Sequence, residues 1–280
     1  MFFSYDDGTP NGPSSWQRLN GRWTCEGRKQ SPININTNTV IQDQIAKNII
    51  IKQFPPHVPL SGIIKNNGHA PTFSLTEGVA VRLSGGTLLN DFYMKQIHFH
   101  FGCTEKTGSE HFIDGVQFPL EMHLVFWDNS TYSTFSQAAK GDNGIAVVAI
   151  LFQREDITGS QPEDLTPLHQ ITGLLKNIRA EGEGLVISED FGVQFDQLVP
   201  SIKDTQKADR VFIYSGSLST PGCYESVTWM VYANTPHVTN KQLQEFRQLR
   251  STKVNREGTM CDNYRPLQKT FGRKIYSNII

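Results

Sequence analysis

The heptapeptide QIHFHFG, residues 96–102, decides how the chain is interpreted, because polar and apolar residues alternate along it. Alternation with a period of two is typical of a half-buried β-strand, in which successive side chains point to opposite faces. His98 and His100 would then share one face of the strand, while Ile97 and Phe99 would point to the other. A single strand would therefore bring two imidazole rings into the same space.

A third histidine, His123, lies in a second apolar stretch, EMHLVFW at residues 121–127. If this stretch pairs beside the first in an antiparallel sheet, the His123 ring can enter the same space. The chain has eight histidines, and four of them fall between positions 98 and 123. Any one alone would be interpreted as a packed core histidine, but together His98, His100 and His123 predict a metal site. Three histidines without a fourth protein ligand are typical of catalytic zinc, which keeps one position for water.

The rest of the chain is also rich in strand and turn patterns. Short apolar or alternating stretches at 73–83, 144–152 and 225–232 are separated by turn pairs such as Asn67-Gly68. Helical spacing occurs at 165–178 and at 243–249, where a capping box from Thr239 to Gln242 precedes it. We predict a mainly β protein, with residues 1–280 as a single domain. It would contain a large twisted, mostly antiparallel but mixed sheet of about ten strands and a few short peripheral helices.

Composition limits the function classes. A chain of 280 residues with 38% hydrophobic content can bury one large core. Its formal net charge is -1, from 26 basic and 27 acidic residues, so no basic surface for nucleic acid is expected. No apolar run approaches the roughly 18 residues of a membrane span, and the first residues, MFFSYDDG, lack the features of a secretory signal. A small substrate is the remaining expectation.

Several motifs together resemble the α-class carbonic anhydrases, especially the secreted or membrane-associated animal members. In the order and at the spacings of that family, the chain contains QSPININ, NNGHA, QIHFHFG, GSEHFIDG, LEMHLVFW, SGSLSTPGCYESVTW and DNYRPLQ. The resemblance implies a zinc lyase, carbonate dehydratase, with one zinc ion per chain. Hydroxide on the zinc would attack carbon dioxide, bicarbonate would leave, and a histidine would carry the proton away. Sulfonamides are expected to bind this zinc.

The resemblance also implies roles for residues around the metal. Gln96, the Asn263 carbonyl and Glu121 would hold His98, His100 and His123 respectively. Ser219 and Glu110 would form a hydrogen-bond relay that orients the nucleophile, and His69 would be the proton shuttle. His111 resembles a buried structural histidine near Tyr214 and Glu121.

Two further groups follow from the resemblance, one polar and one mostly apolar. A chain of water molecules would connect the metal to His69 past Tyr5, Asn66 and Asn67. The substrate slot would be lined by Val125, Val147, Leu218, Thr220, Val227 and Trp229.

Two positions depart from the family pattern. Ser219 stands where the family has threonine, so it keeps the donor and acceptors but lacks the methyl group that stiffens the rotamer. We therefore expect activity with less preorganisation. Pro71 replaces the usual aromatic residue after the shuttle, which leaves the orientation of the His69 ring open.

The cysteines indicate the cellular compartment in which the protein works. The resemblance implies a disulfide between Cys25 and Cys223, as in secreted and membrane-bound members, with free thiols in a cytosolic enzyme as the alternative. Cys103 follows the His100 strand and Cys261 precedes Asn263 by two residues, so they are expected to approach each other, and either pairing or free thiols stays open. The single sequon, at Asn129, predicts glycosylation. We expect a secreted or extracellular protein, with any signal peptide or membrane anchor outside this chain.

Two other functions are alternatives. Some relatives of the family have lost ligand histidines and act as binding or matrix proteins, but this chain keeps all three. A zinc peptidase is the other, and the chain contains no H-E-x-x-H motif.

Overall fold

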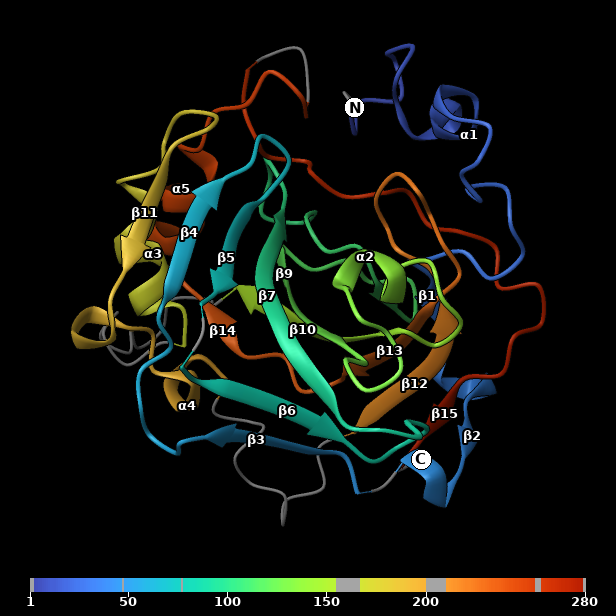
Figure 1. Cartoon of the computed structure of the whole chain (residues 1–280). Coiled ribbons are helices and arrows are strands. Elements are labelled where there is room, and N and C mark those ends of the chain that lie inside the picture. The colour runs from blue at the N-terminus through green and yellow to red at the C-terminus, as the bar shows by residue number, and fades with distance from the viewer. Residues whose placement is uncertain are drawn as a thin grey trace.

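A large twisted sheet forms the centre of the computed structural model, which describes residues 3–46, 48–76, 78–154, 167–199, 210–254 and 258–278 (Figure 1). Within these residues the sheet has 13 strands. Ten of them lie in the order β11 (Gly184–Ile187), β4 (Gly62–Asn66), β5 (Pro71–Leu75), β7 (Phe92–Phe101), β9 (Leu120–Trp127), β10 (Ile145–Arg154), β13 (Val227–Tyr232), β12 (Val211–Gly216), β15 (Tyr276–Ser277) and β2 (Ile41–Gln42).

Shorter strands complete the sheet and form a small second one. β6 (Ala80–Ser84) pairs with β7 and with β3 (Ile50–Phe54), and β14 (His237–Val238) pairs with β10. β1 (Asn34–Ile35) and β8 (Phe112–Ile113) form a separate two-stranded sheet. Among the described strands most pairs are antiparallel, while β10 runs parallel to β13 and β14. The predicted mainly β, mixed architecture is confirmed.

The helices are short and lie at the periphery. They are α1 (Trp16–Leu19), α2 (Phe135–Ala138), α3 (His169–Leu175), α4 (Phe195–Leu198) and α5 (Asn240–Arg247). The capping box predicted at Thr239 and Gln242 is present at the start of α5. The helix predicted over 165–178 is shorter, and Leu165 lies outside the described residues. Leu168 and Ile178 are buried but lie beyond the ends of α3. The three- and four-residue spacing of the apolar residues therefore indicated which positions are buried, but not how long the helix is.

The stretch 73–83 contains two strands instead of one. β5 ends at Leu75 and β6 begins at Ala80. Gly78 between them has φ +120°, a backbone conformation that glycine adopts without steric cost. The glycine inside the apolar pattern therefore marks a turn.

Each face of the sheet carries its own apolar cluster. On β10, Ala146 and Val148 belong to one cluster and Val147 and Ala149 to the other, as strand alternation requires. Helix α5 packs on the first face, where the Phe246 ring centroid is 5.2 Å from that of Phe99. The second face is the one from which the histidines project.

Two disulfides fix distant parts of the chain. Cys25 and Cys223, 198 residues apart, are bonded with a Cα–Cα distance of 4.9 Å, which confirms the first predicted pair. Cys103 and Cys261 are also bonded, with the same Cα–Cα distance and a separation of 158 residues. The pairing left open by the sequence is therefore present.

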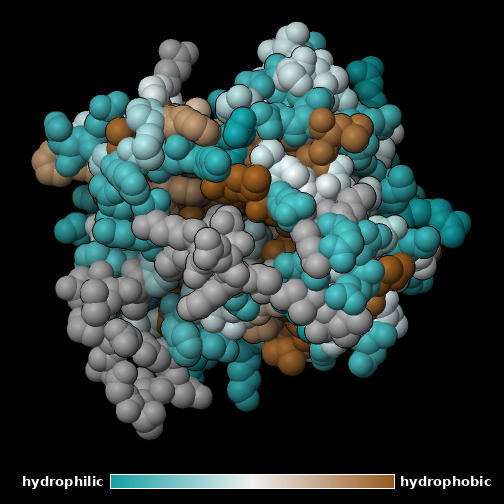
Figure 2. Space-filling model, turned by 90° about the horizontal axis from the view of Figure 1, so that it is seen from below, coloured by the Kyte–Doolittle hydropathy of each residue, from teal (hydrophilic) through white to brown (hydrophobic). Residues whose placement is uncertain are grey.

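In the described part of the chain, no helix combines the length and apolarity needed to cross a bilayer. The face seen in Figure 2 mixes hydrophilic residues with separate hydrophobic patches. Single exposed apolar residues such as Leu89 and Phe191 are normal on protein surfaces.

Candidate metal centre

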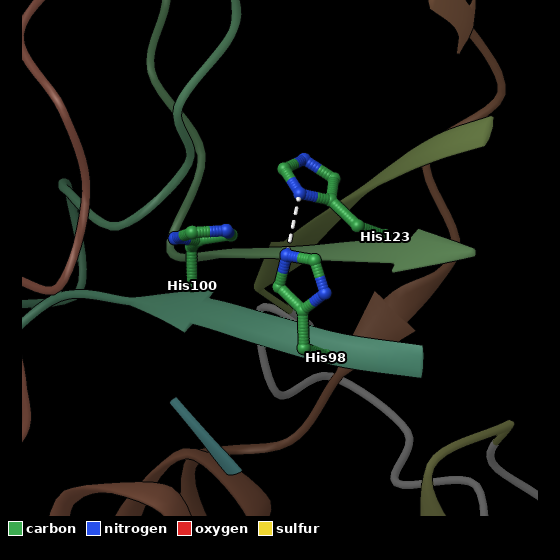
Figure 3. Close-up of side chains that lie close together, drawn as sticks. All are labelled: His98, His100 and His123. Carbon is green, nitrogen blue, oxygen red and sulfur yellow. Dashed lines mark hydrogen bonds between the residues drawn. The ribbon is translucent and has the colours of Figure 1, made fainter. Parts of the chain in front are cut away.

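The three candidate ligands come from two neighbouring central strands. β7 and β9 are antiparallel, and their register places His98 directly opposite His123. His100 lies two residues further along β7, on the same face as His98. Figure 3 shows the three rings gathered above these strands. The strand alternation that predicted the site therefore builds it.

The ring nitrogens of these histidines converge. His123 Nδ1 and His98 Nε2 are 3.1 Å apart (Figure 3), and one nitrogen from each ring lies within 4.8 Å of the others. Ligand nitrogens of a tetrahedral zinc, each about 2.0–2.1 Å from the metal, are roughly 3.3 Å from one another. The spacing of the cluster is therefore of the size that zinc requires.

Two of the rings are held through their second nitrogen. His100 Nδ1 donates to the carbonyl oxygen of Asn263 at 2.6 Å. His123 Nε2 donates to Glu121 Oε1, also at 2.6 Å. These bonds fix the tautomers, because they leave His100 Nε2 and His123 Nδ1 with lone pairs that face the cluster. The predicted partners of His100 and His123 are thus in place.

Glu121 is itself held in a buried network. Its carboxylate also accepts from the backbone nitrogen and Nδ1 of His111, and His111 Nε2 is 2.6 Å from the Tyr214 hydroxyl. Burial by itself would raise the pKa of Glu121, but the electrostatic interactions and hydrogen bonds with His111 and His123 outweigh it and hold the pKa well below its usual value. Glu121 therefore stays an anion that orients His123.

His98 differs from the predicted arrangement. Its Nδ1 is buried and has no hydrogen-bond partner, so the Gln96 side chain does not hold this ring. The pairing of β7 with β9 is irregular between Met94 and Gln96, but from Gln96 to His98 the register is regular, so both residues lie on the same face of β7. The strand thus places Gln96 beside His98 as predicted, but the hydrogen bond to His98 Nδ1 is not made.

The cluster fits a divalent metal by a second criterion. His100 Nε2 is buried and has no hydrogen-bond partner, which is costly for a polar atom unless a ligand accepts its lone pair. Burial, together with the neighbouring histidines, lowers the pKa of His98 well below 6.5, and burial also lowers that of His100. Both rings are then neutral at pH 7, which is the form that binds zinc.

Glu110 lies close to the cluster, but the predicted relay is not formed. Glu110 Oε1 accepts from the backbone nitrogen of Arg265 at 2.9 Å. Glu110 Oε2 is buried without a hydrogen-bond partner, 3.6 Å from His100 Nε2, so no bond joins it to the Ser219 hydroxyl. Ser219 is buried on the loop after β12. Serine lacks the methyl group that would restrict its rotamer, which is consistent with the missing contact.

An apolar wall adjoins the histidines. The register of β9, β10 and β13 places Val125 opposite Val147, and Val147 opposite Trp229. The Trp229 ring centroid is 4.9 Å from that of His123. Val227 is buried in the same cluster and Leu218 packs against it, while Thr220 is partly exposed. The structure thus places Val125, Val147, Val227, Trp229 and Leu218 in one apolar cluster, with the Trp229 ring against His123.

His69 lies on a loop between β4 and β5, and its ring is stacked on Phe3. The two ring centroids are 3.7 Å apart and the ring planes differ by 4°. Burial, and then the positive charge of Lys253, lower the pKa of His69 to about 4, while Glu181 opposes the shift. Its Nδ1 is buried without a partner. In this pose His69 is neutral at pH 7 and a weaker base than an ordinary histidine.

The three residues predicted for the water path have different surroundings. Asn66 is fully buried, and its side chain bonds only backbone groups, those of Gly68, Arg179 and Arg250, so it holds the loop and does not face water. Asn67 is exposed, and its Oδ1 accepts from the backbone nitrogens of His69 and Ala70. Burial, and then the charge of Glu110, raise the pKa of Tyr5 well above 10, which keeps its hydroxyl protonated.

Three site residues escaped the sequence analysis. Phe3 stacks on His69, Arg265 bonds Glu110, and Thr72 pairs with His98 across β5 and β7 while accepting from Asn67 Nδ2 at 3.0 Å. Only Thr72 could have been found from the sequence, because it follows the NNGHA motif in a stretch that pairs with the strand carrying His98. Phe3 and Arg265 reach the site through tertiary packing alone.

A cluster of three histidines with converging nitrogens beside an apolar wall, on one face of a mixed sheet, is the arrangement expected of a mononuclear zinc protein. Comparison with known proteins narrows this class to a family. The model of the eukaryotic-type carbonic anhydrase family matches residues 11–279, so the chain belongs to that family. Membership supports carbonate dehydratase activity, and the family is zinc-dependent.

Curated relatives agree with this assignment over nearly the whole chain. Carbonic anhydrase 7 from Mus musculus is 32% identical over 271 residues, which cover 96% of this chain and 94% of the relative. Carbonic anhydrase 7 from Homo sapiens has the same identity and coverage. Carbonic anhydrase 1 from Monodelphis domestica is 30% identical over 266 residues, 95% of this chain and 94% of the relative.

Proposed function

We propose that this protein catalyses the reversible hydration of carbon dioxide to bicarbonate and a proton, with one zinc ion held by His98, His100 and His123. The observation that supports it most is the convergence of one nitrogen from each ring within 4.8 Å. When bound, zinc would acidify water to a pKa of about 7, a value known from carbonic anhydrase itself, and so supply hydroxide at neutral pH.

The chain's own residues would orient the ligands and the nucleophile. Asn263 and Glu121 hold the His100 and His123 rings with a lone pair toward the cluster. The Ser219 hydroxyl would accept a hydrogen bond from the nucleophile and donate its own proton to Glu110 Oε2. That oxygen supports the proposal, because it is a buried acceptor without a partner. A fixed acceptor at this point would select ligands that carry a proton.

The apolar wall would bind carbon dioxide. Val125, Val147 and Trp229 are each at most 5% exposed and form a continuous row beside His123. Such a surface suits an uncharged linear molecule and keeps water from the reacting carbon. Val227 and Leu218 would extend this wall, and Thr220 would contact bicarbonate from the polar side.

His69 would carry the proton to solvent, but its surroundings oppose the transfer. A pKa of about 4 is well below that of a zinc-bound water, so the neutral ring beside Phe3 accepts a proton poorly. Asn67 holds the backbone of His69. Asn67 and Tyr5 would both lie beside the water path to His69. We infer that proton release is slow in this enzyme and is accelerated by buffer bases.

Location and domain organisation belong to the same proposal. Two disulfides are typical of oxidising compartments, which favours a secreted or extracellular protein. Asn129 is exposed just after β9, where a glycan could be attached. The family match over residues 11–279 supports a single catalytic domain across residues 1–280.

Metal content and carbon dioxide hydration test the function together. We expect one zinc ion per chain and stopped-flow turnover that a sulfonamide abolishes. A chain loaded with zinc but without sulfonamide-sensitive turnover would favour a binding protein. Protein that takes up no zinc would refute both readings of the cluster.

A further inference from the structure

One short segment, residues 261–265, contacts three parts of the proposed active site. The Asn263 carbonyl accepts from His100 Nδ1 at 2.6 Å, and Asn263 Nδ2 donates to the His69 carbonyl at 2.9 Å. Two residues later, Arg265 N donates to Glu110 Oε1, also at 2.9 Å. The position of this segment therefore sets the orientation of a ligand, the shuttle loop and the relay carboxylate.

The segment is joined to β7 by hydrogen bonds that resemble strand pairing. The Asn263 side chain donates to the Phe99 carbonyl at 2.9 Å and accepts from the Phe101 nitrogen at 2.8 Å. Asp262 N donates to the Phe101 carbonyl, and Asp262 Oδ1 accepts from Cys103 N at 3.0 Å. Residues 261–265 thus take the place of a neighbouring strand beside the ligand strand.

This attachment includes a strained residue. Asp262 has φ 63°, in the left-handed region, where a residue with a side chain costs roughly 1 kcal/mol or more unless its surroundings hold it. Asp262 lies between Cys261 and Asn263. Without a restraint at Cys261, relaxation of this residue would move the Asn263 carbonyl away from His100.

We propose that the Cys103–Cys261 disulfide is a positioning element of the metal centre, which holds residues 261–265 on β7 so that the Asn263 carbonyl fixes the His100 tautomer. Cys103 comes two residues after the end of β7, and Cys261 two residues before Asn263. The disulfide therefore ties the start of residues 261–265 to the chain just after the end of β7. The inference rests on the proposed zinc site.

The other disulfide provides a matched control. Cys25–Cys223 closes a loop of 198 residues, longer than the 158 of Cys103–Cys261, so its loss should destabilise the fold at least as much. The Cys223 carbonyl accepts from Thr24 and Gln30. The Cys25 carbonyl accepts from Arg265 Nη2 at 3.3 Å, a backbone acceptor that Cys25→Ala keeps. General destabilisation and a specific effect on His100 can thus be separated.

Zinc release from the two double variants tests the proposal. Wild type, Cys103→Ala/Cys261→Ala and Cys25→Ala/Cys223→Ala are loaded with zinc, and release to excess dipicolinate is followed. We expect release from the Cys103/Cys261 variant to be about 10–100-fold faster than from wild type, the range known for loss of a group that orients a metal ligand. The control variant should release zinc within about twofold of the wild-type rate.

A second readout follows the tautomer directly. In proton NMR spectra of the zinc-free wild type, His100 Nδ1–H should be protected from exchange by its bond to Asn263. This signal should exchange faster in the Cys103/Cys261 variant and not in the control. Equal acceleration of zinc release in both variants, or a wild-type rate in the Cys103/Cys261 variant, would overturn the proposal.

Reduction of the wild-type protein covers the case in which the variant does not fold. Cys103 is exposed, whereas Cys223 is fully buried. Mild treatment with a phosphine should therefore open the Cys103–Cys261 disulfide selectively. Two thiols form and the phosphine becomes its oxide; alkylation and mass spectrometry identify the opened pair. Faster zinc release after this treatment is expected. Wild type that binds no zinc refutes the proposed function, while unchanged release refutes only the role of the bridge.

Discussion

The candidate site contains four relevant histidines in two very different settings. His98, His100 and His123 project from the central strands β7 and β9, and two of them are fixed by hydrogen bonds to Asn263 and Glu121. His69 lies on a loop, and its ring is held by stacking on Phe3 near the N-terminus. The first setting is a network of directional bonds within the core; the second is aromatic packing at its rim, by stacking on Phe3 and by an edge contact with Tyr5.

The difference shows which part of the chemistry depends on which part of the chain. In the proposed function, metal binding would rest on sheet register, which the whole core maintains. Proton transfer would rest on a side chain whose basicity a neighbouring ring can change. Substitutions at the metal histidines should therefore abolish function, whereas substitutions around His69 should adjust it.

Loss of a ligand is the largest expected effect. His100→Ala removes one of three converging nitrogens, so zinc affinity should fall by more than the roughly 100-fold seen when only an orienting group is lost. Turnover should become undetectable. Metal titration with a competing chelator measures the affinity. His57→Ala is the control, because His57 is an exposed histidine that bonds Asp196 away from the cluster, and it should bind zinc as wild type does.

Loss of the Ser219 hydroxyl should come next. Ser219→Ala removes the donor proposed for Glu110 Oε2, and one such preorganised hydrogen bond is typically worth 10²–10³ in kcat. We expect a fall of about 100-fold in kcat/KM for carbon dioxide hydration with zinc content unchanged. Ser219→Thr keeps the hydroxyl and restricts its rotamer, so it should match or exceed wild type. Full activity in Ser219→Ala would exclude the relay.

Neutralising Glu121 tests the support of His123. Glu121→Gln replaces a buried anion that accepts from both His111 and His123, so zinc release should be about 10-fold faster. Turnover per bound zinc should change less than zinc retention. Release measured against dipicolinate separates the two effects. If zinc retention were unchanged, the Glu121 carboxylate would not position the ligand.

The sequence predicted those parts of the site that strand geometry controls. Alternation along 96–102 placed His98 and His100 on one face, and the apolar stretch at 121–127 supplied His123 opposite. Resemblance to the family pointed to Asn263 and Glu121, which bond His100 and His123 in the structure. The alternation of side chains along a regular strand is a local property, so a short sequence pattern is enough to predict it.

Other features depend on contacts that local patterns do not encode. Gln96 and His98 share a face of β7, yet His98 Nδ1 has no hydrogen-bond partner, and the burial of Asn66 turns a polar residue into a backbone brace. Phe3 reaches His69 across 66 positions of sequence. The pKa of His69 follows from that packing, so the sequence alone suggested an ordinary histidine and an efficient shuttle.

The stack on His69 gives the smallest but most diagnostic effect. Phe3→Ala would expose the ring, and because burial is the main cause of the low pKa, the pKa should rise from about 4 toward the usual 6.5. A histidine with that pKa accepts protons from zinc-bound water more readily near neutral pH, so turnover at low buffer concentration should increase severalfold. NMR titration of the His69 ring measures the pKa independently of activity.

Phe3→Tyr is the control, because it keeps the stack and should leave both the pKa of His69 and the turnover near wild type. Lys253 and Glu181 are unchanged in either variant, so a shift confined to Phe3→Ala would assign it to the stacked ring. A pKa that stays near 4 in Phe3→Ala would show that the loop, and not Phe3, sets the basicity of His69.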